Sequence, residues 1–135
     1  MNSQSGRLRV TIGDETGVIQ LYEKECPNTI SALLPELPVS CANLVHARFS
    51  GEECSFPIRR PTAPIARENQ LYQCQVGDVG YFVESAAICF YYGRLKVISP
   101  GNVFGRIVEN MPGLYRMFKL AWWLPDIPVT LSAEA

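Results

Sequence analysis

Hydrophobic and polar residues alternate along most of the chain, which predicts β-strands joined by short turns. Residues 7–12 (RLRVTI) and 18–22 (VIQLY) flank a turn rich in glycine and acidic residues, and they predict a first hairpin. Strands at this spacing favour an antiparallel barrel or sandwich. Further strands are expected where the period of two returns or a short apolar run ends at a glycine: residues 42–49, 53–58, 79–83, 87–92, 103–108 and 129–131.

In two segments the spacing of apolar residues changes from that of a strand to that of a helix. Pro27 suits the first turn of a helix, and Pro35 is expected to break or kink that helix before Pro38 ends it. A second helix is expected over residues 113–123, and Pro125 stops it. The apolar positions of the first helix recur at i, i+3, i+4 and i+7: Ile30, Leu33, Leu34 and Leu37.

Composition narrows the class of protein. The chain has 135 residues, of which 47% are hydrophobic and 19% charged, and these values exclude a disordered chain. A net charge of −1 argues against a nucleic-acid partner, because binding to phosphates needs excess positive charge. We expect a flexible polar leader over residues 1–6 and a single domain over residues 7–135, with a proline-rich loop at 59–70.

The five cysteines form no C-x-x-C pair and no cluster with histidine, so the sequence indicates no metal site and no cofactor. The start of the chain lacks the apolar stretch of a signal peptide, and no apolar run approaches 18 residues. These observations favour a cytoplasmic protein without a membrane partner. In that reducing compartment all five thiols are expected to be free.

Five short segments carry motifs that occur together in one known group of proteins. They are residues 27–34 (PNTISALL), 50–56 (SGEECSF), 77–82 (GDVGYF), 89–93 (CFYYG) and 102–107 (NVFGRI). In this order they resemble an uncharacterised bacterial and archaeal family of small cyclophilin-like proteins. The resemblance implies a mainly β fold, a closed antiparallel eight-stranded cyclophilin-like barrel with two short helices. It implies no reaction, because fold alone does not determine function.

The chain departs from cyclophilins that isomerise peptidyl-prolyl bonds. Those enzymes carry adjacent histidine and arginine residues and a downstream Q-G-G-D segment. Here Ala47 separates His46 from Arg48, and no Q-G-G-D occurs. We therefore expect isomerase activity to be absent or marginal, and we keep it as an alternative function.

A hairpin closed by Ser50-Gly51 as a two-residue loop predicts the candidate site. In that register Arg48 faces Glu53, His46 faces Ser55, and all four side chains share one face of the sheet, with Glu52 beside them at the turn. The arginine would bind a substrate carboxylate, the histidine would move a proton near neutral pH, and a carboxylate would act as a base or orient the pair. The candidate catalytic residues are His46, Arg48, Glu52 and Glu53, and the candidate ligand-binding residues are Ser55, Tyr81, Tyr91 and Tyr92.

Three functions remain open from the sequence. The first is the binding, with or without turnover, of a small anionic metabolite at this polar patch. The second is prolyl isomerisation, which needs an apolar groove beside Arg48. The third is a non-catalytic oligomerising module, in which the patch is only a solvated face and Arg48 and Glu53 form a surface ion pair worth at most about 1 kcal/mol.

Aromatic and other large apolar residues crowd residues 115–124 (YRMFKLAWWL). A single amphipathic helix cannot bury all of them on one face. Tyrosine, tryptophan, phenylalanine and methionine are enriched in protein interfaces. We therefore expect this segment to form a contact between subunits of a homo-oligomer, with completion of the core as the alternative.

Overall fold

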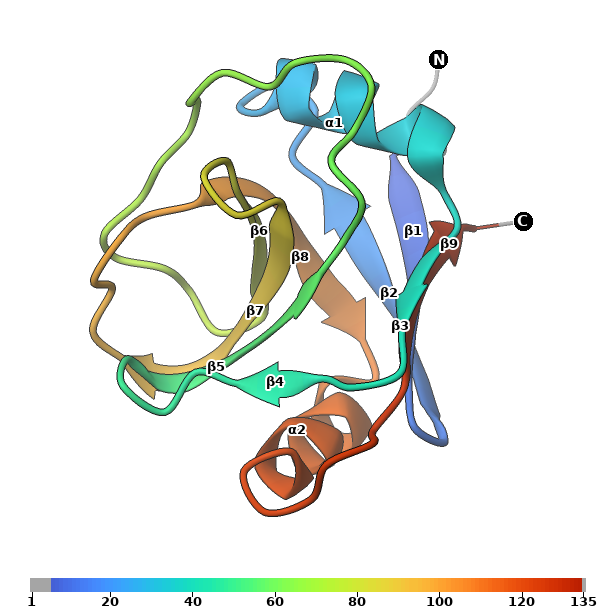
Figure 1. Ribbon diagram of the computed structural model, residues 1–135, viewed down its shortest axis with the longest axis vertical. Helices are drawn as coiled ribbons and strands as arrows, with labels where there is room; N and C mark the ends of the chain where they lie inside the picture. The colour runs from blue at the N-terminus through green and yellow to red at the C-terminus, as the bar shows by residue number, and fades with distance from the viewer. Residues whose placement is uncertain (1–5, 135) are drawn as a thin grey trace.

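The computed structural model describes residues 6–134, so the predicted leader lies outside the described residues except for Gly6. Two α-helices and nine strands make up the described chain, and η2 (Leu34–Glu36) adds one 3-10 turn. Figure 1 shows α1 (Pro27–Leu33) across one end of a curved sheet and α2 (Met111–Leu120) across the other end. The strands are β1 (Arg7–Ile12), β2 (Glu15–Leu21), β3 (Val39–Cys41), β4 (Val45–His46), β5 (Gly51–Pro57), β6 (Asp78–Phe82), β7 (Ala87–Leu95), β8 (Asn102–Glu109) and β9 (Val129–Ala133).

All nine strands belong to one antiparallel sheet with the order β3-β9-β1-β2-β8-β6-β7-β5-β4. The sheet is an open half-barrel, so the prediction of a closed eight-stranded barrel is wrong. Its two edges, β3 and β4, follow one another in the chain but do not pair. Between them Leu44 donates its backbone N–H to the Ile127 carbonyl at 2.8 Å, which leads the chain from one edge to the other without closing the sheet.

The predicted elements agree with the structure except near the sheet edges. Helix α1 ends at Leu33, and Pro35 lies in η2, as the loss of one backbone donor at proline requires. The expected strand over residues 42–49 is wrong, because only β4 pairs with β5 and residues 47–50 turn. The short strand β3 was not predicted, since its three residues show no alternation long enough to detect.

The sheet is buried along its inner face and, around β6, β7 and β8, on its outer face as well. Its inner face, together with one side of each helix, forms the main core, in which Phe56, Phe90, Phe104 and Phe118 are fully buried. The outer face carries a smaller cluster that contains Cys89, Tyr91 and Val103. The irregular segment of residues 58–77 covers that cluster through Leu71 and Cys74.

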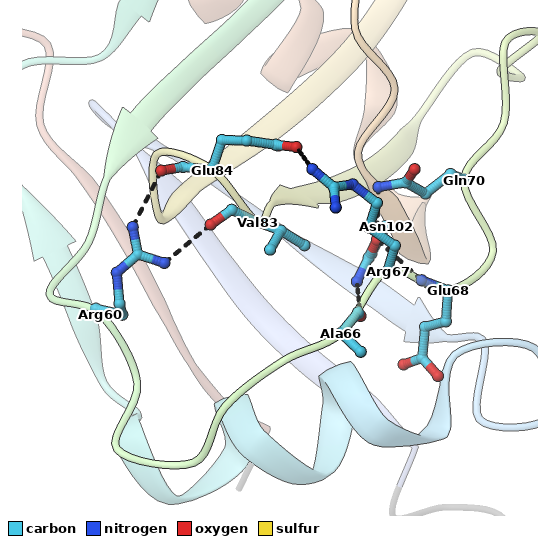
Figure 2. A network of polar contacts seen from close by, with 8 residues as sticks. All are labelled: Arg60, Ala66, Arg67, Glu68, Gln70, Val83, Glu84 and Asn102. Carbon is cyan, nitrogen blue, oxygen red and sulfur yellow. Dashed lines mark hydrogen bonds and ion pairs between the residues drawn. The ribbon is translucent and has the colours of Figure 1, made fainter.

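The side chain of Asn102 attaches this irregular segment to the sheet (Figure 2). Asn102 is fully buried at the start of β8. Its amide oxygen accepts hydrogen bonds from the Glu68 N–H at 3.2 Å and from Gln70 Nε2 at 3.1 Å. Its amide nitrogen donates to the Ala66 carbonyl at 2.9 Å and to Thr29 Oγ1 in α1 at 3.0 Å. One buried side chain therefore joins β8, helix α1 and the covering segment.

The same segment supplies the cap of helix α1. Cys26 precedes the helix but makes no side-chain capping hydrogen bond. Instead Glu68 Oε2 accepts from the Thr29 N–H at 2.6 Å and from its hydroxyl at 2.8 Å. Partial burial opposes ionisation of Glu68, but the hydrogen bonds from Thr29 outweigh it and hold the carboxyl pKa below its ordinary value.

Replacing Asn102 by alanine is expected to destabilise the protein by about 3 kcal/mol. The variant loses four hydrogen bonds that each contribute roughly 1 kcal/mol, and one of the partners left behind, Thr29, is fully buried. Urea unfolding measures the change. Asn28→Ala is the control, because Asn28 is exposed and makes one side-chain bond, to Glu68 at 3.1 Å. A loss for Asn102→Ala no larger than that of the control would contradict the assigned role.

Candidate functional site

The pairing of β4 with β5 differs by one residue from the prediction. Val45 lies opposite Ser55, and His46 lies opposite Cys54. The connection is longer than two residues, because Ser50 donates its N–H to the Ala47 carbonyl within the turn. A β-bulge between Gly51 and Glu53 then shifts β5 against β7. A shift of one residue moves each side chain of one strand to the other face relative to its expected partners.

The predicted pair of Arg48 and Glu53 is therefore wrong. Glu53 points to the outer face, is only 4% exposed, and accepts a hydrogen bond from Ser50 Oγ at 2.6 Å. Burial raises its pKa above the ordinary carboxyl value. Burial is the main cause that raises the pKa values of Cys89 and Tyr91, which belong to the cluster under residues 58–77, and the nearby Glu53 carboxylate raises them further.

His46 instead points to the inner face of the sheet, at the end that α2 covers. It is 9% exposed, and its ring lies edge-on to Trp122 with the centroids 4.6 Å apart. Nε2 lies 2.5 Å from the Tyr92 hydroxyl, whose proton has no other acceptor among the described residues, so Tyr92 donates and Nε2 accepts. The ring hydrogen then belongs on Nδ1, which is buried and has no partner among the described residues.

Arg48 lies on the same side as His46. Its guanidinium carbon is 5.1 Å from the centroid of the Trp122 ring, within cation–π range. Nη2 also donates a hydrogen bond to the Trp122 carbonyl. Around these groups is an open cavity of about 420 Å³, which we call the His46 cavity. Its lining consists of Asn43, Leu44, Val45, His46, Arg48, Ala121, Trp122, Trp123, Leu124 and Pro125.

The electrostatic surroundings keep His46 neutral. Burial is the main cause that lowers its pKa, and the positive charges of Arg48 and Lys119 lower it further, whereas Glu52 opposes them. The resulting pKa is about 4. A neutral imidazole that accepts a hydrogen bond from Tyr92 differs from the expected proton transfer near neutral pH.

Glu52 does not line the His46 cavity, but three hydrogen bonds fix its carboxylate near the same end of the sheet. Its Oε1 accepts from the Arg94 N–H at 2.6 Å, and its Oε2 accepts from Lys119 Nζ at 3.1 Å and the Tyr115 hydroxyl at 3.3 Å. The bond from the Arg94 N–H is the main cause of a lowered Glu52 pKa. Gly93 permits this position, because a Cβ atom there would overlap the carboxylate.

The other predicted site residues are dispersed. Tyr92 contacts His46, but Tyr91 points to the opposite face with its hydroxyl buried and unpartnered among the described residues. Tyr81 lines a separate cavity formed with residues 60–65. Ser55 pairs with Val45 and Cys89 and lines neither cavity near His46. The structure thus unites His46, Arg48 and Tyr92 and separates them from Glu53, Ser55, Tyr81 and Tyr91.

Trp122 and Trp123 belong to the His46 cavity, whereas the sequence predicted a subunit contact for them, with a place in the core as the alternative. Helix α2 buries Leu114, Met117 and Phe118, whereas Trp123 is 77% exposed. The crowding of aromatic residues over 115–124 was the signal for these cavity walls. The expected homo-oligomer stays a prediction, because one chain by itself carries no subunit interface.

This fold and site define the class as a mainly β protein, with an antiparallel half-barrel, two short helices and a cavity at one end of the sheet. The chain belongs to the DUF3830 family of proteins of unknown function, whose family model matches residues 8–133. A search of curated proteins finds no match.

The solved structures similar to this chain include the following two. One is described as the structure of McbB in complex with tryptophan, with a TM-score of 0.81 and 18% identity over 95% of this chain. This chain spans only 45% of that protein. The other is the solution structure of the hypothetical protein AF2241 from Archaeoglobus fulgidus, with a TM-score of 0.68 and 24% identity over 98% of both chains. At these identities the similarity shows the fold alone.

Within residues 6–134, no three histidine, cysteine or acidic side chains are grouped so as to hold a metal ion. The helices of this part of the chain are also too short and too polar to cross a bilayer.

His46 is the only histidine of the chain, so its titration is directly observable. We expect NMR of the imidazole carbons to show a pKa near 4, because burial and two nearby cations disfavour the charged ring. Arg48→Ala is expected to raise that pKa, and Arg9→Ala, which removes an exposed arginine on β1, is expected to leave it unchanged. A wild-type pKa above 6 would contradict the assigned burial.

Glu53 is expected to make stability fall as the pH rises. Its folded-state pKa is raised by burial, so the unfolded chain releases this proton first, and stability decreases from the ordinary carboxyl pKa up to the raised one. Glu53→Gln removes that decrease, and its stability relative to wild type is expected to grow between pH 4 and pH 7. Thermal unfolding at both values measures this growth. The control is Glu84→Gln at an exposed carboxylate with a lowered pKa, where no such gain is expected.

Proposed function

We propose that this protein binds a small aromatic carboxylate in the His46 cavity. The observation that carries the proposal is the buried Nδ1 atom of His46, which has no hydrogen-bond partner among the described residues and belongs to a side chain that lines the cavity together with Arg48. A buried donor left unpaired costs about 1–3 kcal/mol, and a ligand oxygen at that position recovers it. An arginine beside it favours a carboxylate over a neutral carbonyl, because guanidinium pairs with carboxylate in a two-bond geometry.

Aromatic side chains favour a flat apolar body for the same ligand. Trp122 stands against both His46 and Arg48, and Trp123 is an exposed wall of the cavity. Rings that pack edge-to-face or offset against tryptophan gain about 0.5–1.5 kcal/mol beyond burial of their area. The cavity volume of about 420 Å³ is within the usual range for small-molecule sites.

The solved neighbour described as a complex with tryptophan supports an aromatic amino acid as one ligand of this class. Tryptophan carries the carboxylate and the flat ring that this cavity favours. The positive charges of Arg48 and Lys119 near His46 disfavour the ammonium group of tryptophan. A simple aromatic acid is therefore the better probe, with tryptophan as a comparison.

The sequence motifs support a distant relationship to cyclophilin-like proteins, and we keep this as part of the proposal. Prolyl isomerisation and a purely oligomerising role are the alternative functions. The apolar residues at the rim of the His46 cavity favour oligomerisation as the second candidate. In the lining of this cavity Trp123 is 77% exposed and Val45 51% exposed.

Calorimetric titration with benzoate tests the proposed binding. We expect Arg48→Ala to weaken benzoate binding about tenfold, because the loss of a charge-assisted hydrogen bond costs at least about 1.4 kcal/mol. Benzamide, which lacks the charge, is expected to bind wild-type protein more weakly than benzoate and to be insensitive to Arg48→Ala.

Arg9→Ala is the matched control, because it removes an equal charge at an exposed position on β1. If the benzoate affinity falls equally in both variants, Arg48 acts only through the net charge of the protein and not through a direct contact. The proposal is wrong if benzoate does not bind the wild-type protein at millimolar concentration or binds Arg48→Ala equally well.

A further inference from the structure

A second cavity lies at the same end of the sheet, separate from the His46 cavity. Its volume is about 490 Å³, and its walls come from β5, β7, the start of α2 and residue 76. We call it the Glu52 cavity. It is lined by Glu52, Val76, Tyr92, Gly93, Arg94, Met111, Pro112 and Tyr115. The two linings share no residue, but Tyr92 forms a wall of this cavity and donates its hydroxyl to His46 of the other.

The Glu52 carboxylate is the hydrogen-bond acceptor of this cavity. An ionised carboxylate accepts about four hydrogen bonds, two at each oxygen. Among the described residues, Oε2 already accepts from Lys119 and Tyr115, whereas Oε1 accepts only from the Arg94 N–H. Oε1 therefore keeps one free acceptor position, in a side chain that lines the cavity.

The charges around Glu52 select a neutral donor over a cation. Lys119 already pairs with the carboxylate, with 3.1 Å between Nζ and Oε2. The Arg94 side chain adds a second positive charge to the wall of the cavity. A ligand ammonium would face both of these cations, whereas a neutral N–H group donates to Oε1 without that repulsion.

The remaining walls favour an aromatic body. Tyr92 and Tyr115 meet edge to face with ring centroids 5.4 Å apart and line the cavity together. Met111 adds a thioether, which contacts aromatic rings favourably. Val76 and Pro112 are apolar and exposed, so a bound ring would bury surface that is now in water.

We propose that the Glu52 cavity is a second ligand site, which binds a neutral aromatic heterocycle through an N–H group donated to Glu52 Oε1. Indole is the simplest probe of this class. The proposal is independent of benzoate binding in the His46 cavity, since it involves different residues and a ligand without negative charge.

Titration of the protein with indole, followed in amide NMR spectra, tests this site. The Arg94 amide donates to the same Oε1 atom and therefore reports on it. We expect saturable shifts at Arg94, with indole binding at least fivefold more tightly than 1-methylindole, which differs only by lacking the donor. Tryptamine, the cationic relative, is expected to bind more weakly than indole.

Glu52→Gln is expected to reduce indole binding at least fivefold and to abolish the preference over 1-methylindole. Glu23→Gln, which neutralises an exposed carboxylate elsewhere, is the matched control and is expected to bind indole as wild type does. If Glu52→Gln fails to fold, the comparison of the three ligands on wild-type protein still decides. Equal binding of indole and 1-methylindole, tighter binding of tryptamine, or shifts confined to residues of the His46 cavity would each overturn the proposal.

Discussion

The buried amide of Asn102 is the constraint on which the arrangement of the other elements depends. Residues 58–77 form no helix and no strand of their own. Only some of their backbone groups bond to neighbouring strands, such as the Asn69 carbonyl to β8 and the Gly77 N–H to β7, so the segment needs further partners. Asn102 supplies both donors and acceptors to this segment and reaches α1 through Thr29. Because the segment is held there, the outer face is covered, and Tyr91 and Cys89 are as buried as residues of the main core.

The register of β5 determines the chemistry at the other end of the sheet. The bulge after Gly51, whose φ of 114° suits only glycine, places Glu52 on the side of Lys119 and sends Glu53 to the covered outer face. The same register brings His46 next to Tyr92 and Trp122. Tyr92 thus lines the Glu52 cavity and donates its hydroxyl to His46 of the His46 cavity.

Most elements could be predicted from the sequence because their patterns are local. The period of two identified β1 and β6–β8, and proline marked the end of α1. The site could be predicted only in part. The turn after His46 lacks the Asn-Gly pair that marks a two-residue hairpin loop, so the sequence does not distinguish such a loop from a longer one. The resulting error of one residue exchanged the roles of Glu52 and Glu53. The sheet edges also depend on contacts far apart in sequence, such as that of Leu44 with Ile127, which local patterns do not contain.

The capping of α1 by Glu68 has a consequence for how the folded protein opens. A helix of seven residues is too short to persist in water by itself, and its capping carboxylate lies almost forty residues further along the chain. Release of residues 58–77 would remove the cap, free the Thr29 hydroxyl and expose the outer face of the sheet in one event. Helix α1 and this irregular segment therefore form one cooperative unit of partial unfolding, whose amide hydrogens exchange with solvent together although they belong to distant parts of the chain.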